Sequence, residues 1–308
     1  MRKGFTLTIL LSVIAFTSIG MWGDILKAGP ALRNFSWYLI PLIAFFGFCN
    51  DLVKFFRWHV YLQKMGIRIR AKKSLDIFLA GLSMSATPGK AGLLIKTQML
   101  KGVTGHSMIS TSPIIAAELY MDLLGLSLIS LLGIGLLGNE IWIALLLSML
   151  PLLGLVPGIP GFAIGQLEKI PILSGRAVEM RKALDSIFGL FGVRVLIVSL
   201  TITLIAWASE GFALSLILRG LGFDVGIVTT TVLFGFSTLI GVLSMLPGGL
   251  MVTDASLMGL LVQTGIPNTP AAVASIMARI FTLWLAVIVG SIFFIMHRNY
   301  MNRDLKEK

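Results

Sequence analysis

Glu118 and Asp122 are the first residues of this sequence that suggest chemistry, because they lie four residues apart within an apolar stretch, AAELYMDLLG. Residues at this spacing share one face of a helix. Two carboxylates that close repel each other when both are ionised, so one of them can hold a proton near neutral pH. The pair predicts a site that binds a cation or takes up a proton. Simple pairing with Arg279 or a lysine is the alternative.

Arg279 stands in another apolar stretch, SIMARIFTLW, near the C-terminal end. Ionisable residues at membrane depth are rare and costly, so each one is a functional hypothesis by default. A guanidinium is always charged and suits bidentate binding of phosphate. Lys90, Lys96 and Asp254 complete the predicted substrate-binding and translocation set. Lys96 could instead extend along apolar surface to the cytoplasmic side.

Pro-Gly sequences interrupt two further apolar segments, in LSMSATPGK and LSMLPGG. Proline removes a backbone donor and glycine loosens a helix, so a helix is expected to end at each break. The helix that follows would present free N–H groups and a partial positive charge to an anion such as phosphate. The alternative is that Pro-Gly only forms the tight turn of a hairpin. The break residues are Pro88, Gly89, Pro247, Gly248 and Gly249.

Six apolar stretches are long enough to cross about 30 Å of hydrocarbon as helices. The two broken segments, 75–101 and 227–265, have limbs that are short for a full crossing and are predicted to be re-entrant hairpins. The bilayer tolerates such backbone only where it is buried in protein or lines a wet cavity. Limbs that span completely would leave the remaining topology unchanged. The predicted spans are 5–23, 36–56, 108–137, 141–162, 190–218 and 270–296.

The net charge of +11 lies mainly in loops that flank apolar stretches. By the positive-inside rule, the loop after the second span, the 163–189 loop and the C-terminal tail are cytoplasmic. Segments 138–140 and 219–226 carry little positive charge and are expected outside, so both termini are predicted inside. The loop after the second span is expected to carry Lys54, Arg57, Lys64, Arg68, Arg70, Lys72 and Lys73.

These spans predict an all-α polytopic membrane protein, with residues 1–308 forming a single membrane domain that ends in a tail at 298–308. The halves, about 1–137 and 141–297, share the order span, span, hairpin, span in opposite orientations. This order is typical of inverted-repeat transporters, in which broken helices meet near the midplane. Chance similarity between apolar segments is the alternative.

The repeat makes Glu118 and Arg279 counterparts, because each lies about the same distance after its own Pro-Gly break. We therefore expect these oppositely charged residues to share one central cavity. Glu210 stands within the fifth span, beside Trp207 in sequence, and the pattern does not decide whether it faces that cavity.

Composition excludes several other classes of protein. The chain is 56% hydrophobic and 13% charged, whereas soluble domains are about 25% charged. Its one cysteine, Cys49, excludes an internal disulfide, and His59, His106 and His297 are not spaced like metal ligands. No nucleotide-binding loop or HExxH pair occurs. We therefore predict no cofactor, no metal, no nucleic-acid partner and no soluble-enzyme active site.

Three motifs resemble, in order and spacing, the flippase-like membrane family named for the transmembrane region of lysylphosphatidylglycerol synthases. They are TPGKAGLLIKTQML at 87–100, AAELYMDLLGL at 116–126, and LPGGLMVTDASLMGLLVQTG at 246–265, followed by Arg279. The resemblance covers nearly the whole chain. It implies broken hairpins in a helical bundle, a bacterial or archaeal plasma (inner) membrane, and a role in moving lysylated or glycosylated lipids across it.

The sequence departs from the family pattern at each motif. Leu93 and Lys96 stand where the first motif has an acid and an arginine, and Leu119 replaces the arginine of the second. Met251 and Asp254 replace the last glycine and the acid of the third. These departures concern the substrate more than the fold. Full synthases also carry a soluble aminoacyl-transfer domain, which this sequence lacks, so we do not expect it to lysylate lipid by itself.

Three functions are compatible with these patterns. A lipid translocase would hold the phosphate of a phospholipid, aminoacylated lipid or glycolipid at Arg279 and the hairpin N-termini, while Glu118 and Asp122 contact a cationic headgroup or couple a proton. An intramembrane enzyme would need a nucleophile–base pair or a metal cluster, which the sequence does not show. The third possibility is a non-catalytic membrane partner of a separately encoded glycosyl- or aminoacyl-lipid transferase.

Overall fold

The computed structural model describes residues 29–87, 93–133, 135, 141–154, 156, 158–167 and 185–301. Within these ranges the secondary structure is helical and contains no strand. Four helical stretches are long and apolar enough to cross a membrane, which confirms the predicted all-α membrane class. They are Trp37–Lys64, Met108–Leu132, Val193–Gly220 and Asn268–His297. The predicted first span, 5–23, lies outside the described residues, and the number of crossings stays a prediction.

The second predicted span is longer than the sequence suggests. A short helix α2 (Gly29–Arg33) and a 3-10 turn η2 (Trp37–Leu39) lead into α3 (Ile40–Lys64). Lys54 and Arg57 therefore lie inside this helix and are buried, so assigning them to a cytoplasmic loop was wrong. The physical reason is that a carboxylate from a distant helix neutralises both side chains, as described below.

Both Pro-Gly segments lie between two helices, as predicted. In the first, α4 (Ala71–Leu82) precedes and α5 (Ile95–Thr104) follows the break. In the second, α11 (Ile227–Leu243) leads to a 3-10 turn η6 (Pro247–Gly249) and then α12 (Val252–Gln263). Pro88, Gly89 and Lys90 lie outside the described residues. The membrane depth of the hairpins stays a prediction.

The second break reverses the chain through left-handed backbone conformations. Gly248 and Gly249 adopt φ of 59° and 65°, which glycine reaches without a Cβ clash. Met245 and Met251 adopt φ of 57° and 67°, where a side chain is strained. Two strained methionines on either side of Pro-Gly-Gly fix a sharp turn between α11 and α12.

Each hairpin is followed by a long helix. Met108–Leu132 is α6, and Ser107 begins it by accepting a hydrogen bond from the Ser110 N–H at 3.1 Å. After the second hairpin, α13 (Asn268–Arg279), a π-helical segment η7 (Ile280–Trp284) and α14 (Leu285–His297) form one stretch, which ends in η8 (Arg298–Met301). The π-helical turn begins directly after Arg279, and such turns are frequent at functional sites.

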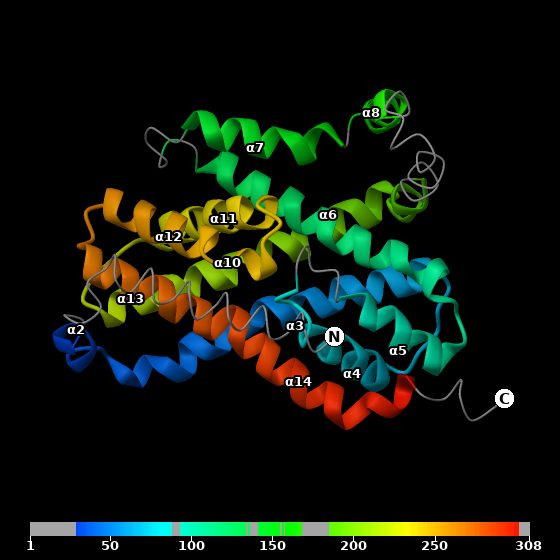
Figure 1. The fold of residues 1–308 in the computed structure, drawn as a ribbon, viewed down its shortest axis with the longest axis horizontal. Coiled ribbons are helices and arrows are strands. Elements are labelled where there is room, and N and C mark those ends of the chain that lie inside the picture. Colours follow the sequence, from blue (N-terminus) through cyan, green and yellow to red (C-terminus); the bar gives the residue numbers. More distant parts are fainter. Residues whose placement is uncertain are drawn as a thin grey trace.

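Residues 141–162, predicted as one span, contain two shorter helices instead. They are α7 (Ile141–Leu153) and α8 (Ile159–Leu167). The N–H of Gly154 turns back to the Pro151 carbonyl, and Gly158 has a φ of 88°, so the segment does not continue as one helix. In Figure 1, α7 lies along the outer side of α6.

The halves of the chain interlock through their hairpins (Figure 1). Long helix α3 packs against α10 (Val193–Gly220), the long helix of the second half. The first limb of each hairpin packs on the helix that follows the other hairpin, since α4 contacts α14 and α11 contacts α6. A Cβ at Gly290 of α14 would overlap the backbone of Leu82 and Ser83, so the α4–α14 contact requires glycine.

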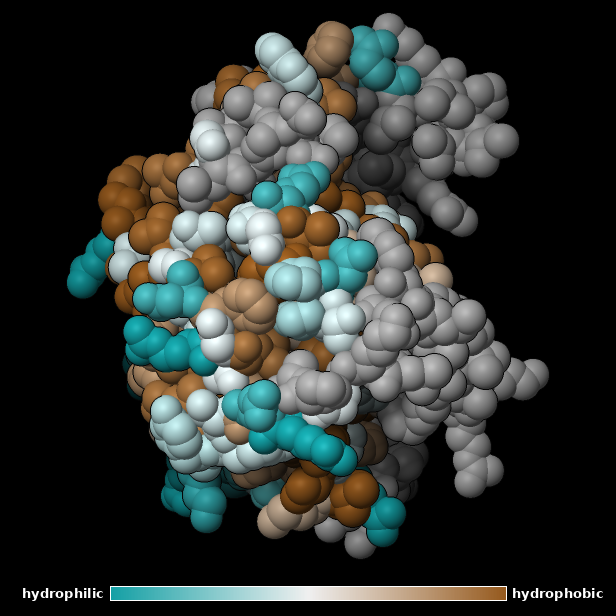
Figure 2. Space-filling view, turned by 90° about the vertical axis from the view of Figure 1, so that its left-hand side faces the viewer, coloured by the Kyte–Doolittle hydropathy of each residue, from teal (hydrophilic) through white to brown (hydrophobic). Residues whose placement is uncertain are grey.

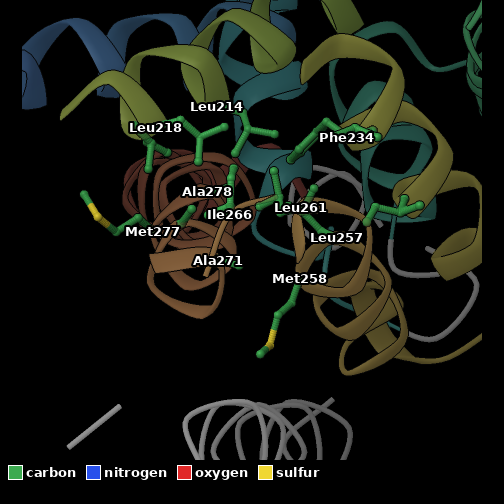
Figure 3. Close-up of a cluster of buried hydrophobic side chains, with 14 of the residues drawn as sticks. Leu214, Leu218, Phe234, Leu257, Met258, Leu261, Ile266, Ala271, Met277 and Ala278 are labelled. Carbon is green, nitrogen blue, oxygen red and sulfur yellow. The ribbon is translucent and has the colours of Figure 1, made fainter. Parts of the chain in front are cut away.

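Apolar side chains fill the bundle and also cover its outside. In Figure 3, Leu214 and Leu218 of α10 face Leu261 of α12 and Ala278 of α13, all of them buried. Figure 2 looks onto one end of the bundle, where hydrophilic residues lie among hydrophobic ones. Large apolar side chains are exposed on several helices, as a surface in contact with lipid requires. Examples are Phe45, Phe56, Ile205 and Ile292.

Candidate functional site

A buried ion pair ties the second hairpin to the helix that follows it. Arg279 at the end of α13 donates from Nε to Asp254 Oδ1 at 2.8 Å and from Nη1 to the carbonyl of Gly248 at 3.1 Å. Asp254 is 2% exposed and also accepts a hydrogen bond from the N–H of Met251. Ser275 donates to the Asp254 carbonyl. The guanidinium thereby fixes both the break and the first turn of α12.

The N-terminus of α12 already has a carboxylate partner. The side chain of Asp254 caps the helix, and the N–H groups of Gly249 and Leu250 donate to carbonyls within the turn. A phosphate bound to the backbone near Gly248 and Gly249, as predicted, would therefore have to compete with the carboxylate of Asp254. Arg279, and not the backbone, is the anion-binding group that this hairpin offers.

The first hairpin is also tied to its following helix by an ion pair, but here the base lies on the hairpin limb and the acid on the helix. Lys96 of α5 bonds through Nζ to Oε2 of Glu118 on α6 at 2.5 Å. The two side chains are 4% and 5% exposed. The ammonium of Lys96 also lies 4.7 Å from the ring centroids of Trp58 and Phe78, which adds cation–π attraction. Glu118 therefore pairs with a lysine, the simpler alternative, and Lys96 does not extend to the surface.

Asp122 forms a second cluster one turn further along α6. It accepts from Arg57 Nη2 at 2.9 Å and from Lys54 Nζ at 3.2 Å, and both cations belong to α3. Arg57 also donates from Nη1 to Thr203 Oγ1 on α10 at 2.5 Å. The Lys54 ammonium lies 3.9 Å from the ring centroid of Trp207, also on α10. This cluster therefore links the three long helices α3, α6 and α10 to one another.

A cavity of about 290 Å³ lies between this cluster and the second hairpin. Residues of both halves line it, from α3, α6 and α10 on one side and from the hairpin break and the π-helical segment on the other. Glu210 faces the cavity, which resolves the question that the sequence leaves open. The charged residues of the lining are Asp51, Lys54, Asp122, Glu210 and Arg279.

Several lining side chains have buried polar atoms without a hydrogen-bond partner among the described residues. They are Nδ2 of Asn50, Nη2 of Arg279, Nε1 of Trp207 and Oγ1 of Thr238. Three of these atoms are N–H donors that cannot accept a hydrogen bond. Buried polar groups are normally satisfied, so the lining is chemically matched to a ligand rich in acceptor oxygens, such as a phosphate.

The structure brings together only part of the predicted site. Arg279 and Asp122 line the same cavity, whereas Glu118, Lys96 and Asp254 are not among its lining residues. Arg279 bonds Asp254 and Glu118 bonds Lys96, and the sharing of one cavity by Arg279 and Glu118 stays a prediction. The two residues do occupy corresponding places, because each anchors its own hairpin.

The sequence reasoning missed the polar stripe of α3. Asn50, Lys54 and Arg57 are spaced as one face of a helix and are all buried. Their separation by four and three residues was the available signal, because it is the spacing of one helix face and a loop at the membrane edge would not require it. Positive charge next to an apolar run normally indicates a loop at the membrane edge, which is why the stripe escapes the positive-inside rule. The ring of Trp207 packs against the ammonium of Lys54, a contact that the position of Trp207 in the sequence does not indicate.

No grouping of three or more histidine, cysteine, aspartate or glutamate side chains suited to a metal ion occurs in the described part of the chain.

Comparison with known proteins places these features in a family. Two UPF0104 membrane proteins of Methanothermobacter thermautotrophicus are similar to part of the chain. One is 30% identical over 92 residues, covering 30% of this chain and 28% of the relative. The other is 27% identical over 96 residues, covering 31% and 28%. Each alignment spans less than a third of the relative's length.

The family described as the lysylphosphatidylglycerol synthase TM region matches a far longer part of the sequence. The match runs over residues 6–290 and so includes both hairpins and every residue of the cavity lining. Because it covers nearly the whole chain, this protein belongs to the lysylphosphatidylglycerol synthase transmembrane-region family.

Proposed function

We propose that this protein is a lipid translocase. A phospholipid, aminoacylated lipid or glycolipid places its headgroup in the cavity, while its acyl chains stay in the bilayer. One observation carries the proposal. The cavity lies within an apolar bundle, and its lining includes a fixed guanidinium whose Nη2 has no partner among the described residues.

The phosphate of the lipid binds on the hairpin side of the cavity. Arg279 supplies the permanent charge, and its contacts with Asp254 and Gly248 hold it in place before a ligand arrives. Asn50 adds a neutral donor from α3. A donor set that is held in position loses little conformational entropy on binding, which favours affinity.

The remainder of the headgroup faces the other side of the cavity. Asp51 and Glu210 supply negative charge there, and Lys54 and Asp122 form an ion pair. This side suits an amine or a sugar hydroxyl better than a second phosphate. The cavity volume of about 290 Å³ is at the small end of the usual range for ligand pockets, so it suits a headgroup with few groups beyond the phosphate.

The packing of the two halves provides a route for movement. Each hairpin is tied by an ion pair to its own following helix and packs against the following helix of the other half. Relative motion of the halves would move both hairpin breaks past the cavity, as alternating access requires. The protein carries lipid without changing it, in the plasma membrane and with both termini cytoplasmic.

Lipid exchange in proteoliposomes tests this function. Fluorescent anionic, lysylated and glycosylated lipids are compared for wild type and for a double variant, Arg279→Gln with Asp254→Asn, which removes both buried charges together. Arg219→Gln is the matched control, because Arg219 is 68% exposed on α10 and lies 3.6 Å from Asp224. Exchange of one lipid class should fall at least tenfold in the double variant and stay at the wild-type rate in the control.

Three outcomes would contradict the proposal. Exchange at the rate of empty liposomes, for every lipid class and with folded protein, would exclude a translocase. A transferase that co-purifies in a fixed ratio would then favour the non-catalytic partner. Chemically altered lipid after incubation with the pure protein would instead indicate an enzyme.

A further inference from the structure

Three helices carry a ladder of polar residues that leads away from the cavity. Each helix contributes two residues one turn apart, so the six side chains form an upper and a lower rung. The upper rung is Arg57, Asp122 and Thr203, and the lower rung is Tyr61, Glu118 and Ser199. We call this set the polar ladder.

The upper rung is joined by direct hydrogen bonds. Arg57 bonds both Asp122 and Thr203, and Thr203 donates in turn to the carbonyl of Ser199 at 2.7 Å. Asp122 lines the cavity, so this rung is where the polar ladder meets the binding site.

The polar ladder contains polar atoms that the described protein groups do not satisfy. Oε1 of Glu118 and Nε of Arg57 have no hydrogen-bond partner among the described residues. Like Tyr61 and Ser199, these two residues are at most 4% exposed. The Tyr61 hydroxyl interacts with the hydroxyl of Ser199 and lies within electrostatic range of Arg57, Glu118 and Asp122.

Unsatisfied buried groups identify sites for ordered water. A buried water makes about three hydrogen bonds to polar groups that lack protein partners, and leaving such groups unpaired is unfavourable. A hydrogen-bonded chain of hydroxyls, carboxylates and waters can pass a proton along, because each group both donates and accepts a hydrogen bond when the carboxylate is protonated. Intramembrane acid chains serve as proton relays for the same reason.

The polar ladder points toward one end of the bundle. Tyr61 is closer than Arg57 to the end of α3, and Glu118 and Ser199 are closer than their partners to the starts of α6 and α10. These three helix ends lie on the same side of the molecule in Figure 1. The positive-inside rule predicts that side to be cytoplasmic.

We propose that the polar ladder is a water-filled proton path between the cytoplasmic side and the cavity, and that a proton is the coupling ion of the translocase. This inference assumes the function proposed above. A proton from the cytoplasm binds the Glu118 carboxylate and loosens its ion pair with Lys96. It then passes through the lower-rung water to Asp122 and leaves through the cavity, so one proton enters and one leaves.

The charged and titratable groups around the polar ladder come from three helices, α3, α5 and α6. Lys54, Arg57 and Tyr61 face it from α3, Lys96 from α5, and the two acids from α6, while α10 contributes only hydroxyls at these rungs. Arg57 stays charged at all relevant pH values. The mobile charge is therefore carried by Glu118 and Asp122.

A pH-sensitive dye trapped in proteoliposomes tests the path. A proton gradient is imposed, and dye response and lipid exchange are measured in parallel for wild type and for Tyr61→Phe with Ser199→Ala. These changes remove both hydroxyls of the lower rung and leave the Lys96–Glu118 and Arg57–Asp122 ion pairs in place. Proton entry should fall at least fivefold, and the gradient should no longer accelerate lipid exchange. The control is Ser127→Ala, which removes a buried hydroxyl on the opposite face of α6 that has no hydrogen-bond partner in the described part of the chain, and it should match wild type.

The parallel measurements separate the two proposals. Lipid exchange by wild type without any proton entry would overturn the proton path and leave the translocase standing. Proton entry without lipid exchange would overturn the translocase. Proton entry at the wild-type rate in the double variant, with unchanged melting temperature, would show that the polar ladder is not the route.

Discussion

Arg279 and Asp254 are joined by a 2.8 Å hydrogen bond between Nε and Oδ1, and this contact anchors the outgoing limb of the second hairpin. Lys96 and Glu118 anchor the outgoing limb of the first hairpin, but here the base is on the limb and the acid is on the following helix. Both pairs are buried. Each pair therefore holds a broken helix against its own half of the chain, while the cavity lies next to only one of them.

The Asp254–Arg279 pair should behave as a unit in stability measurements. Asp254→Asn or Arg279→Gln alone should lower the free energy of unfolding by about 3–5 kcal/mol, because each leaves a buried charge without its partner. The double variant should recover most of that loss. Thermal unfolding in detergent measures it, and Arg219→Gln, in an exposed pair, should change stability by less than about 0.5 kcal/mol. The coupling would be refuted if the free energy of unfolding of the double variant were no higher than that of the less stable single variant.

Gly81 should be essential for the Lys96–Glu118 pair. A Cβ at this position would overlap Cγ and Cδ of Lys96, so Gly81→Ala should push the ammonium away from Glu118 and destabilise the protein by a few kcal/mol, about 1–3 on the scale of overpacked cores. Gly259→Ala in α12 is the matched control, because a Cβ there meets nothing within 4 Å. The control should be neutral or stabilising, since alanine favours a helix. Equal melting temperatures for the two variants would contradict the prediction.

Asn50 should contribute to headgroup binding and not to stability. Its Nδ2 is buried without a partner among the described residues, so Asn50→Leu should leave the melting temperature unchanged or raise it. Lipid exchange should fall by about three- to tenfold, a loss of roughly 1 kcal/mol that is typical of one hydrogen bond to a ligand. Ser148→Ala removes a buried hydroxyl of α7 that none of the described residues bonds, and it should leave exchange unaffected. Normal exchange by the Asn50 variant would remove this residue from the site.

Thiol labelling should show where α3 leaves the membrane. In a Cys49→Ser background, Phe56→Cys should resist a water-soluble reagent, because Phe56 is 62% exposed on an apolar face that contacts lipid. Arg68→Cys should react from the cytoplasmic side, and Asp224→Cys, at the loop after α10, should react from the other side. Labelling of both loop positions from one side would overturn the predicted topology.

The local sequence was enough to predict which segments are helices and where they break. Apolar runs near membrane length predicted helices that the structure contains around 36–56, 108–137, 190–218 and 270–296. Pro247, Gly248 and Gly249 predicted the turn between α11 and α12, since proline and glycine act on the backbone where they stand. These features depend on neighbours within a few residues, so pattern alone finds them.

Local pattern failed where a distant partner decided the outcome. A lysine and an arginine after an apolar run normally mark a membrane edge, and Lys54 and Arg57 fit that description. Asp122, more than sixty residues away, keeps both inside the bundle, because pairing offsets the cost of burying a charge. The partners of Glu118 and Arg279 were likewise set by the packing of each hairpin limb on its following helix.

Hydropathy and residue type alone therefore predict a helical membrane protein, its two helix breaks, and the kinds of charge within its apolar segments. The packing of the helices is needed to see which charges neutralise each other, which of them face the cavity, and that Asn50, Trp207 and Glu210 belong to its lining. The physical reason is that hydropathy and backbone preference act locally, whereas the cost of a buried charge depends on every helix packed around it.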